Sequence, residues 1–298
     1  LVTAVIIYAI GGGLIEVLIS PIVDALPGDA KASAMSLLHS FYCWGQMTVV
    51  IVTTLLLWAF GLEIWYILPI LWSLVPIYNI FRFAKVPLVP PIPEEHKTPI
   101  KRLLTTNIFV VAMVLMICAG AAELTMSQWS SLFAELGLGV PKVVGDLLGP
   151  ALFALFMGIG RTVYGIWGHK IHLKSALLGS AIFCVLCYAV TVFAAHPLVS
   201  LMGCALCGLA VALMWPGTFS LTAASFPLGG TALFGILAIC GDIGAATGPW
   251  LAGVASQYAL DSSRLLSYGV KNGLSPDQVS LRFGLLVAMI FPIAAIVG

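Results

Sequence analysis

Long apolar runs recur along this whole sequence, and they decide which solvent the chain can fold in. A transmembrane helix needs about 20 consecutive apolar residues. Soluble domains are about a quarter charged, whereas 8% of these 298 residues are charged and 61% are hydrophobic. So few charges could not cover the surface of a soluble fold, and we expect an all-α integral membrane protein. Nine predicted segments span about 1–26, 33–60, 63–81, 104–134, 144–166, 175–194, 197–224, 230–259 and 279–298.

The net charge and the cysteines narrow the classes of partner. A formal net charge of +1 argues against nucleic acid. Four of the seven cysteines have the spacing C-x2-C-x16-C-x2-C, which in a soluble protein would predict zinc. These four lie inside apolar runs without His, Asp or Glu, so we expect helix packing, no metal and no disulfide. They are Cys184, Cys187, Cys204 and Cys207.

The positive charges predict the orientation of the chain. Cytoplasmic loops of membrane proteins are enriched in Lys and Arg, and most of the 13 such residues fall in one alternating set of loops. We therefore expect a multi-pass protein of the cell inner (plasma) membrane. Residue 1 would lie outside and the C-terminus in the cytoplasm. Because Leu1 opens inside an apolar segment without an initiator Met, we also expect a fragment of a longer chain.

A basic, Pro-rich stretch at 83–103 predicts a cytoplasmic central loop between two helix bundles. It would separate the last three helices of an N-terminal bundle, residues 1–82, from a C-terminal six-helix bundle, residues 104–298. "GLIEVLISP" (13–21) and "GLAVALMWP" (208–216) form a weak internal repeat. The repeat fits two parallel six-helix halves related by an axis along the membrane normal.

Another signal marks the start of the last helix. Ser275, Pro276 and Gln278 occupy the cap, first and third positions of a predicted helix. Ser and Gln at this spacing form a capping box, and Pro is favoured at the first helical position.

Three stretches resemble the major facilitator superfamily, most closely its fucose permease-like sugar:proton symporters. They are "GGGLIEVLISPIV" with "SAMSLLHSFYCWGQ", "MGIGRTVYGIWGHK", and "MWPGTFSLTAASFPLGGTALFGILAICGDIGAATGPWLAG". The resemblance implies two pseudo-symmetric six-helix bundles, of which this chain carries about nine helices equivalent to helices 4–12. The sequence departs from the family in two places. "YGIWGHK" lacks the acidic residue of the loop signature, and His39 and Tyr42 stand where relatives carry Gln and Asn.

Glu16 is the main candidate for proton coupling. A charged carboxyl at the centre of a membrane helix costs roughly 2.5–3.5 kcal/mol or more, and a protonated one avoids most of this cost. A proton-coupled carrier needs such a group, neutral while it crosses and charged when it faces water. The repeat places Val211 at the equivalent position, so the helix itself does not require a carboxylate. The alternative is a structural hydrogen bond to a neighbouring helix.

Polar residues on other segments are candidates for substrate binding. His39, Tyr42 and Gln46 share one helix face and could bind hydroxyls in a central cavity or bond another helix. Trp129 could stack on the apolar face of a sugar or mark the membrane interface. The remaining candidates are Glu123, Gln128 and Asp242, and Arg161 is expected at a cytoplasmic helix end as a gate or latch.

The leading functional hypothesis is a secondary active transporter, a proton-coupled symporter of a sugar or polyol that works by alternating access. An exporter of drugs or other metabolites on the same fold is the main alternative. We expect a monomer with no cofactor besides the coupling proton. An ATP-binding motif is absent, a membrane enzyme lacks a supporting nucleophile, and a receptor built on a carrier fold stays open.

Overall fold

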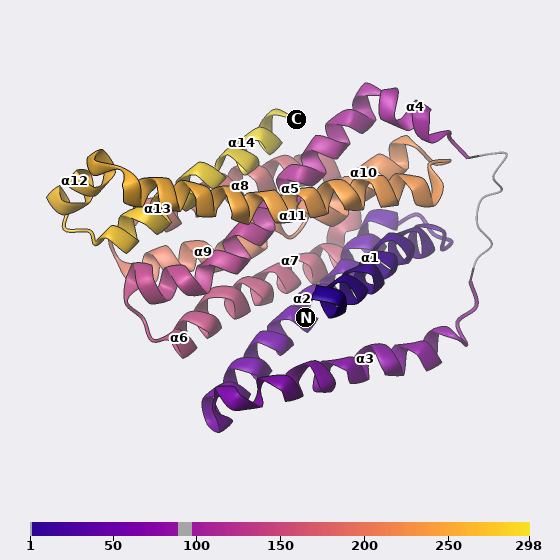
Figure 1. Ribbon diagram of the computed structural model, residues 1–298. Helices are drawn as coiled ribbons and strands as arrows, with labels where there is room; N and C mark the ends of the chain where they lie inside the picture. The colour runs from indigo at the N-terminus through magenta and orange to yellow at the C-terminus, as the bar shows by residue number, and fades with distance from the viewer. Residues whose placement is uncertain (1, 89–96) are drawn as a thin grey trace.

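The computed structural model describes residues 2–88 and 97–298 of the chain (Figure 1). Within these ranges the regular structure is helical, and nine helical stretches are long and apolar enough to cross a membrane. This confirms the predicted class and the nine segments. The predicted central loop, 83–103, lies partly outside the described residues, and its last part, from Ile100, is already helical.

The first three spans come before that loop. They are α1 (Val2–Asp24), α2 (Lys31–Phe60) and η1 (Leu62–Tyr66) with α3 (Ile67–Phe83). After the loop come α4 (Ile100–Thr105), α5 (Asn107–Leu132), η3 (Phe133–Gly137), α6 (Lys142–Asp146), η4 (Leu147–Ala151), α7 (Leu152–Trp167), η5 (Gly168–Lys170) and α8 (Leu173–Phe193). The chain ends with α9 (Pro197–Val211), α10 (Met214–Ser225), α11 (Gly230–Asp261), α12 (Ser263–Lys271), α13 (Pro276–Ala288) and α14 (Ile290–Val297).

Proline distorts the backbone bonding in two of the predicted spans. The span predicted at 197–224 splits into α9 and α10 just before Pro216, and η4 is a wide helical turn that contains Pro150. The predicted start of α13 is confirmed, because Ser275 accepts from the Gln278 amide and the Gln278 side chain accepts from the Ser275 amide.

The helices after the loop form one packed body, and α2 is tightly joined to it. The interface between α5 and α11 is the most extensive in the structure, and α2 packs along α7 (Figure 1). One core cluster lies around Tyr188, Phe153 and the four cysteines of α8 and α9. A second cluster around Phe219 and Phe109 includes Met35 of α2.

The N-terminal half of α1 and nearly all of α3 expose their apolar side chains in this structure. Three consecutive small residues, Gly11, Gly12 and Gly13, predict a close-packing surface for a neighbouring helix. This expectation is not met among the described residues, because a Cβ built on any of the three meets nothing within 4 Å.

Candidate functional site

A buried ion pair lies where α2 meets the helices that follow the loop. Arg161 of α7 donates from Nη2 to Oε2 of Glu123 on α5 at 2.8 Å. The two residues are 2% and 4% exposed. A buried ion pair survives only when its partners satisfy each other and the remaining donors find acceptors.

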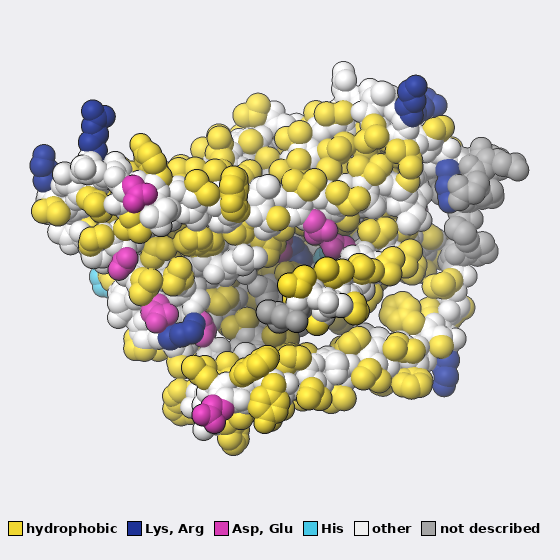
Figure 2. All heavy atoms as spheres, viewed as in Figure 1, with side chains coloured by type: hydrophobic (Ala, Val, Ile, Leu, Met, Phe, Trp, Pro, Cys, Tyr) yellow, Lys and Arg dark blue, Asp and Glu magenta, His cyan; other side chains and the backbone are white. Residues whose placement is uncertain are grey.

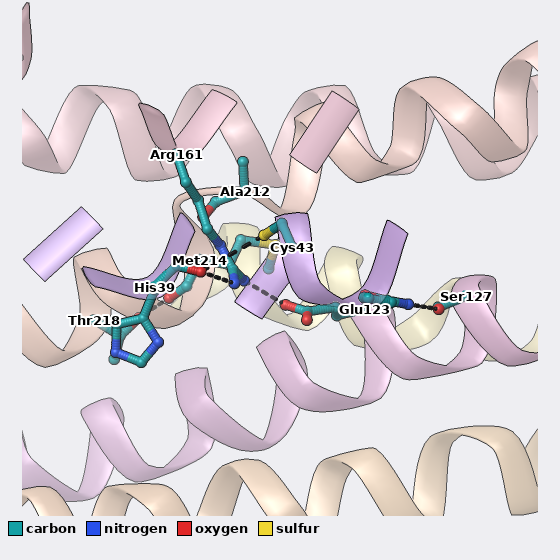
Figure 3. A network of polar contacts seen from close by, with 9 residues as sticks. His39, Cys43, Glu123, Ser127, Arg161, Ala212, Met214 and Thr218 are labelled. Atoms are coloured by element: carbon teal, nitrogen blue, oxygen red, sulfur yellow. Dashed lines mark hydrogen bonds and ion pairs between the residues drawn. The ribbon is translucent and has the colours of Figure 1, made fainter. Parts of the chain in front are cut away.

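The other donors of Arg161 do find acceptors, and these lie on different elements. Nε donates to the carbonyl of Ala212 at 2.9 Å, and Nη1 donates to the carbonyl of His39 at 3.1 Å. Figure 3 shows the guanidinium pointing between the His39 carbonyl and Glu123. Its carbon also lies 5.9 Å from the centre of the Tyr42 ring. Arg161 therefore links α2 to α5, α7 and the α9–α10 break.

The expected position of Arg161 at a helix end is wrong. The residue lies inside α7, which continues to Trp167, and its side chain is buried against Glu123. The helix ends close to the predicted boundary at residue 166, but a single sequence does not show that α5 supplies a carboxylate at the depth of Arg161.

Further hydrogen bonds connect α2 with the same body. Ser36 donates to the carbonyl of Arg161 at 2.8 Å, and Trp44 donates to Thr162 of α7 at 3.3 Å. Gln46 donates from Nε2 to Ser127 of α5 at 2.8 Å, while its Oε1 is buried without a partner among the described residues. These bonds form a polar seam along α2, and we use that name for Ser36, His39, Trp44 and Gln46.

The side chains of His39, a member of this seam, and of Tyr42 lie beside these bonds. The His39 ring is 3.3 Å from the Ser20 hydroxyl of α1 and packs at 5.7 Å from the Phe219 ring of α10. The Tyr42 side chain is 50% exposed. The predicted polar face of α2 is thus placed beside Glu123 and Arg161.

Glu16 and Asp242 carry two further carboxylates near this ion pair. Glu16 is partly buried on α1 and Asp242 is exposed on α11. The Glu16 carboxylate lies within electrostatic range of both Asp242 and Glu123. In residues 2–88 and 97–298, neither Glu16 nor Asp242 has a hydrogen-bond or ion-pair partner. Figure 2 shows acidic, basic and histidine side chains together in a hollow between α11 and α1.

Two predicted residues lie outside this cluster. Gln128 is exposed on α5, and Trp129 packs against α11 near Gly253. A cavity of about 590 Å³ also lies elsewhere, between α5, α8, α10 and the last residues of the chain. Its lining is mainly apolar and includes none of the predicted site residues.

Sequence reasoning missed the partners of Arg161. Ser36 is an ordinary small residue of a membrane helix, and the Ala212 carbonyl belongs to the backbone. The sequence did contain one signal for the Ala212 carbonyl. Pro216 lies four residues later and has no amide N–H that could donate to the carbonyl of Ala212.

Comparisons with known proteins agree with this architecture. A sequence model of the Major Facilitator Superfamily matches residues 1–249. None of the curated proteins matches the chain. The fold is similar to a crystal structure of a variant of the E. coli fucose:proton symporter FucP, with 14% identity and a TM-score of 0.64, covering 94% of this chain and 73% of that one. It is also similar to FucP in the outward conformation, with 16% identity, a TM-score of 0.67 and coverage of 94% and 71%.

At these identities the two structures establish the fold alone. The family match extends over most of the sequence and includes the α2 seam and the first seven of the helical spans in the described residues. The chain belongs to the Major Facilitator Superfamily of membrane transporters.

Proposed function

We propose that the full-length protein is a proton-coupled symporter of a sugar or polyol that works by alternating access. One observation supports this most directly, the contrast between two membrane carboxylates. Glu123 is 4% exposed and paired with Arg161. Glu16 is only partly buried and has no partner in the described parts of the chain.

This contrast gives the two carboxylates different roles. Glu123 has a guanidinium at 2.8 Å that compensates its negative charge. No described residue gives Glu16 a compensating cation, so binding a proton lowers the cost of burying it when water leaves its surroundings. Glu16 is therefore the group that takes up and releases the coupling proton.

The residues beside Glu16 suit a hydroxylated substrate. Tyr42 and His39 can each donate to or accept from hydroxyls, and the buried Oε1 of Gln46 is an acceptor without a partner among the described residues. Because Arg161 is enclosed by its own acceptors, the polar seam offers neutral hydrogen-bonding groups rather than an apolar pocket. This disfavours an exporter of lipophilic compounds. The likeness to a fucose:proton symporter adds support at the level of the fold.

Uptake into proteoliposomes by the full-length transporter tests the proposal across a panel of sugars and polyols, with and without an inward proton gradient. The protein should accumulate one of them when the gradient is present. Glu16→Gln should abolish accumulation but retain exchange of labelled for unlabelled substrate, because the amide mimics the protonated state. Glu63→Gln, an exposed acidic residue in η1, is the matched control.

Two results would contradict this function. Accumulation by the Glu16→Gln protein against the substrate gradient would remove the coupling role of Glu16. Competition by lipophilic cations, with none by sugars or polyols, would favour the exporter.

A further inference from the structure

Pro216 creates one of the acceptors that hold Arg161. In an α-helix each amide donates to the carbonyl four residues earlier, but proline has no N–H. Residue 216 therefore cannot bond to the carbonyl of Ala212, which lies in the break between α9 and α10. Arg161 Nε donates to this carbonyl at 2.9 Å. Ala212 is 1% exposed and Arg161 is 2% exposed, so water cannot replace Arg161 as the donor to this carbonyl.

The same guanidinium reaches two other elements. Nη1 contacts the His39 carbonyl of α2 at 3.1 Å, and Nη2 contacts Glu123 of α5 at 2.8 Å. A guanidinium is planar and its donors have a fixed geometry. A shift of the Ala212 carbonyl therefore re-aims the donors that hold α2 and Glu123.

We propose that Pro216 is a positioning residue for transport: the carbonyl that it frees fixes Arg161 against α2, so that bending at the α9–α10 break and movement of α2 are coupled. Pro216 acts through Arg161. Because Pro216 has no N–H, the Ala212 carbonyl is free to accept from Arg161. An amide at position 216 would compete for this carbonyl and draw it away from Arg161.

Pro249 provides a matched control within the same half of the molecule. It lies inside α11 and likewise cannot bond to the carbonyl of Ala245. Across the described ranges, no side chain donates to that carbonyl. Pro249→Ala therefore restores an amide in a transmembrane helix without competing with an arginine.

The first experiment is a double-mutant cycle on the apparent Tm of the purified full-length transporter. Pro216→Ala is introduced into the wild type and into Glu123→Gln/Arg161→Met, a background that leaves neither charge buried alone. Without Arg161 the new amide takes an unoccupied carbonyl, so the Tm should rise by about 2–4 °C. In the wild type the Tm should stay the same or fall, because Arg161 loses its acceptor. Equal shifts in both backgrounds, as expected for Pro249→Ala, would overturn the proposal.

Hydrogen exchange gives a second measurement that does not need the charge-free background. Pro216→Ala should speed amide exchange in α2 between His39 and Cys43, although these residues lie on a different helix. Pro249→Ala should leave that segment unchanged. Unchanged exchange in α2 for Pro216→Ala would contradict the coupling.

Transport provides the functional readout, and this part alone rests on the proposed function. With the substrate that the uptake panel identifies, Pro216→Ala should lower the maximal rate and leave KM unchanged, because Pro216 does not touch substrate. A change in KM alone would reject the positioning role. The Tm and exchange measurements need no substrate, so failure of the symport proposal is distinguishable from failure of this one.

Discussion

Among single residues, Arg161 and Glu123 should have the largest effect on the free energy of unfolding when one of them is replaced. Removing two charges from water costs several kcal/mol each, and their attraction offsets this only with good geometry and full hydrogen bonding. The distances of 2.8, 2.9 and 3.1 Å around Arg161 meet that condition. Such pairs add little net stability but are costly to break, so they fix one arrangement of the helices.

Replacing only one member of this ion pair should therefore strongly lower the stability of the protein. Arg161→Met should lower the stability of the protein by about 3–5 kcal/mol, because the Glu123 carboxylate is left buried and unpaired. Adding Glu123→Gln should recover much of the loss. The apparent Tm of the purified variants measures both effects.

The pair between Lys142 and Asp146 is the control for this comparison. Its atoms lie 3.2 Å apart, but the lysine side chain is 63% exposed. Lys142→Met should change the stability by less than about 1 kcal/mol. If Arg161→Met were as mild as Lys142→Met, the buried pair would have no structural importance.

At the scale of helices, close packing between α5 and α11 depends on glycine. A Cβ on Gly244 would lie 2.0 Å from the carbonyl oxygen of Ile117, which is backbone and cannot turn aside. Gly244→Ala should therefore force the helices apart and give a protein with a strongly lowered Tm or aggregation in size-exclusion chromatography.

Gly179 of α8 shows the opposite situation. A Cβ there meets nothing within 4 Å, so Gly179→Ala should be neutral or stabilising by up to about 1 kcal/mol through helix propensity. A Gly244→Ala protein with the Tm of Gly179→Ala would show that the α5–α11 distance is adjustable.

The start of α13 offers a milder test at the same scale. Ser275→Ala removes the acceptor of the Gln278 amide, which lies 3.2 Å from the Ser275 hydroxyl oxygen. The loss should be about 1 kcal/mol and should appear as faster exchange of the Gln278 amide. Ser267→Ala, in exposed α12, should not change that rate. Equal exchange in both variants would show that the cap contributes nothing.

The whole molecule shows which parts of the architecture a single sequence determines. Apolar length alone predicted the spans, and local chemistry predicted the cap at Ser275. The polar face of α2 was also predicted, because helical periodicity is a local property. The partner of Arg161 could not be, because it depends on which helices pack together and at what depth. The predicted packing surface at Gly11 to Gly13 was wrong for the same reason, since small residues permit close packing but do not specify a partner helix.

The polar seam also makes a prediction about motion of the whole transporter. Alternating access requires one half to rock against the other around the substrate site, yet α2 packs along α7. A Cβ on Gly165 would lie 3.0 Å from the Leu37 Cβ, near the 3.5–4.5 Å of a disulfide. Oxidised Leu37→Cys/Gly165→Cys should therefore lose uptake, and reduction should restore it.

The controls separate this lock from oxidation damage. All seven native cysteines are free and buried, so the oxidised wild type should keep its uptake. Ala134→Cys/Gly145→Cys joins η3 to α6 within one half, where a built Cβ on Gly145 lies 3.3 Å from that of Ala134. It should cross-link without stopping transport, because both elements move together. Full uptake by the oxidised Leu37→Cys/Gly165→Cys protein would mean that α2 and α7 stay joined throughout the cycle, and the two halves would then have to pivot around this seam rather than open along it.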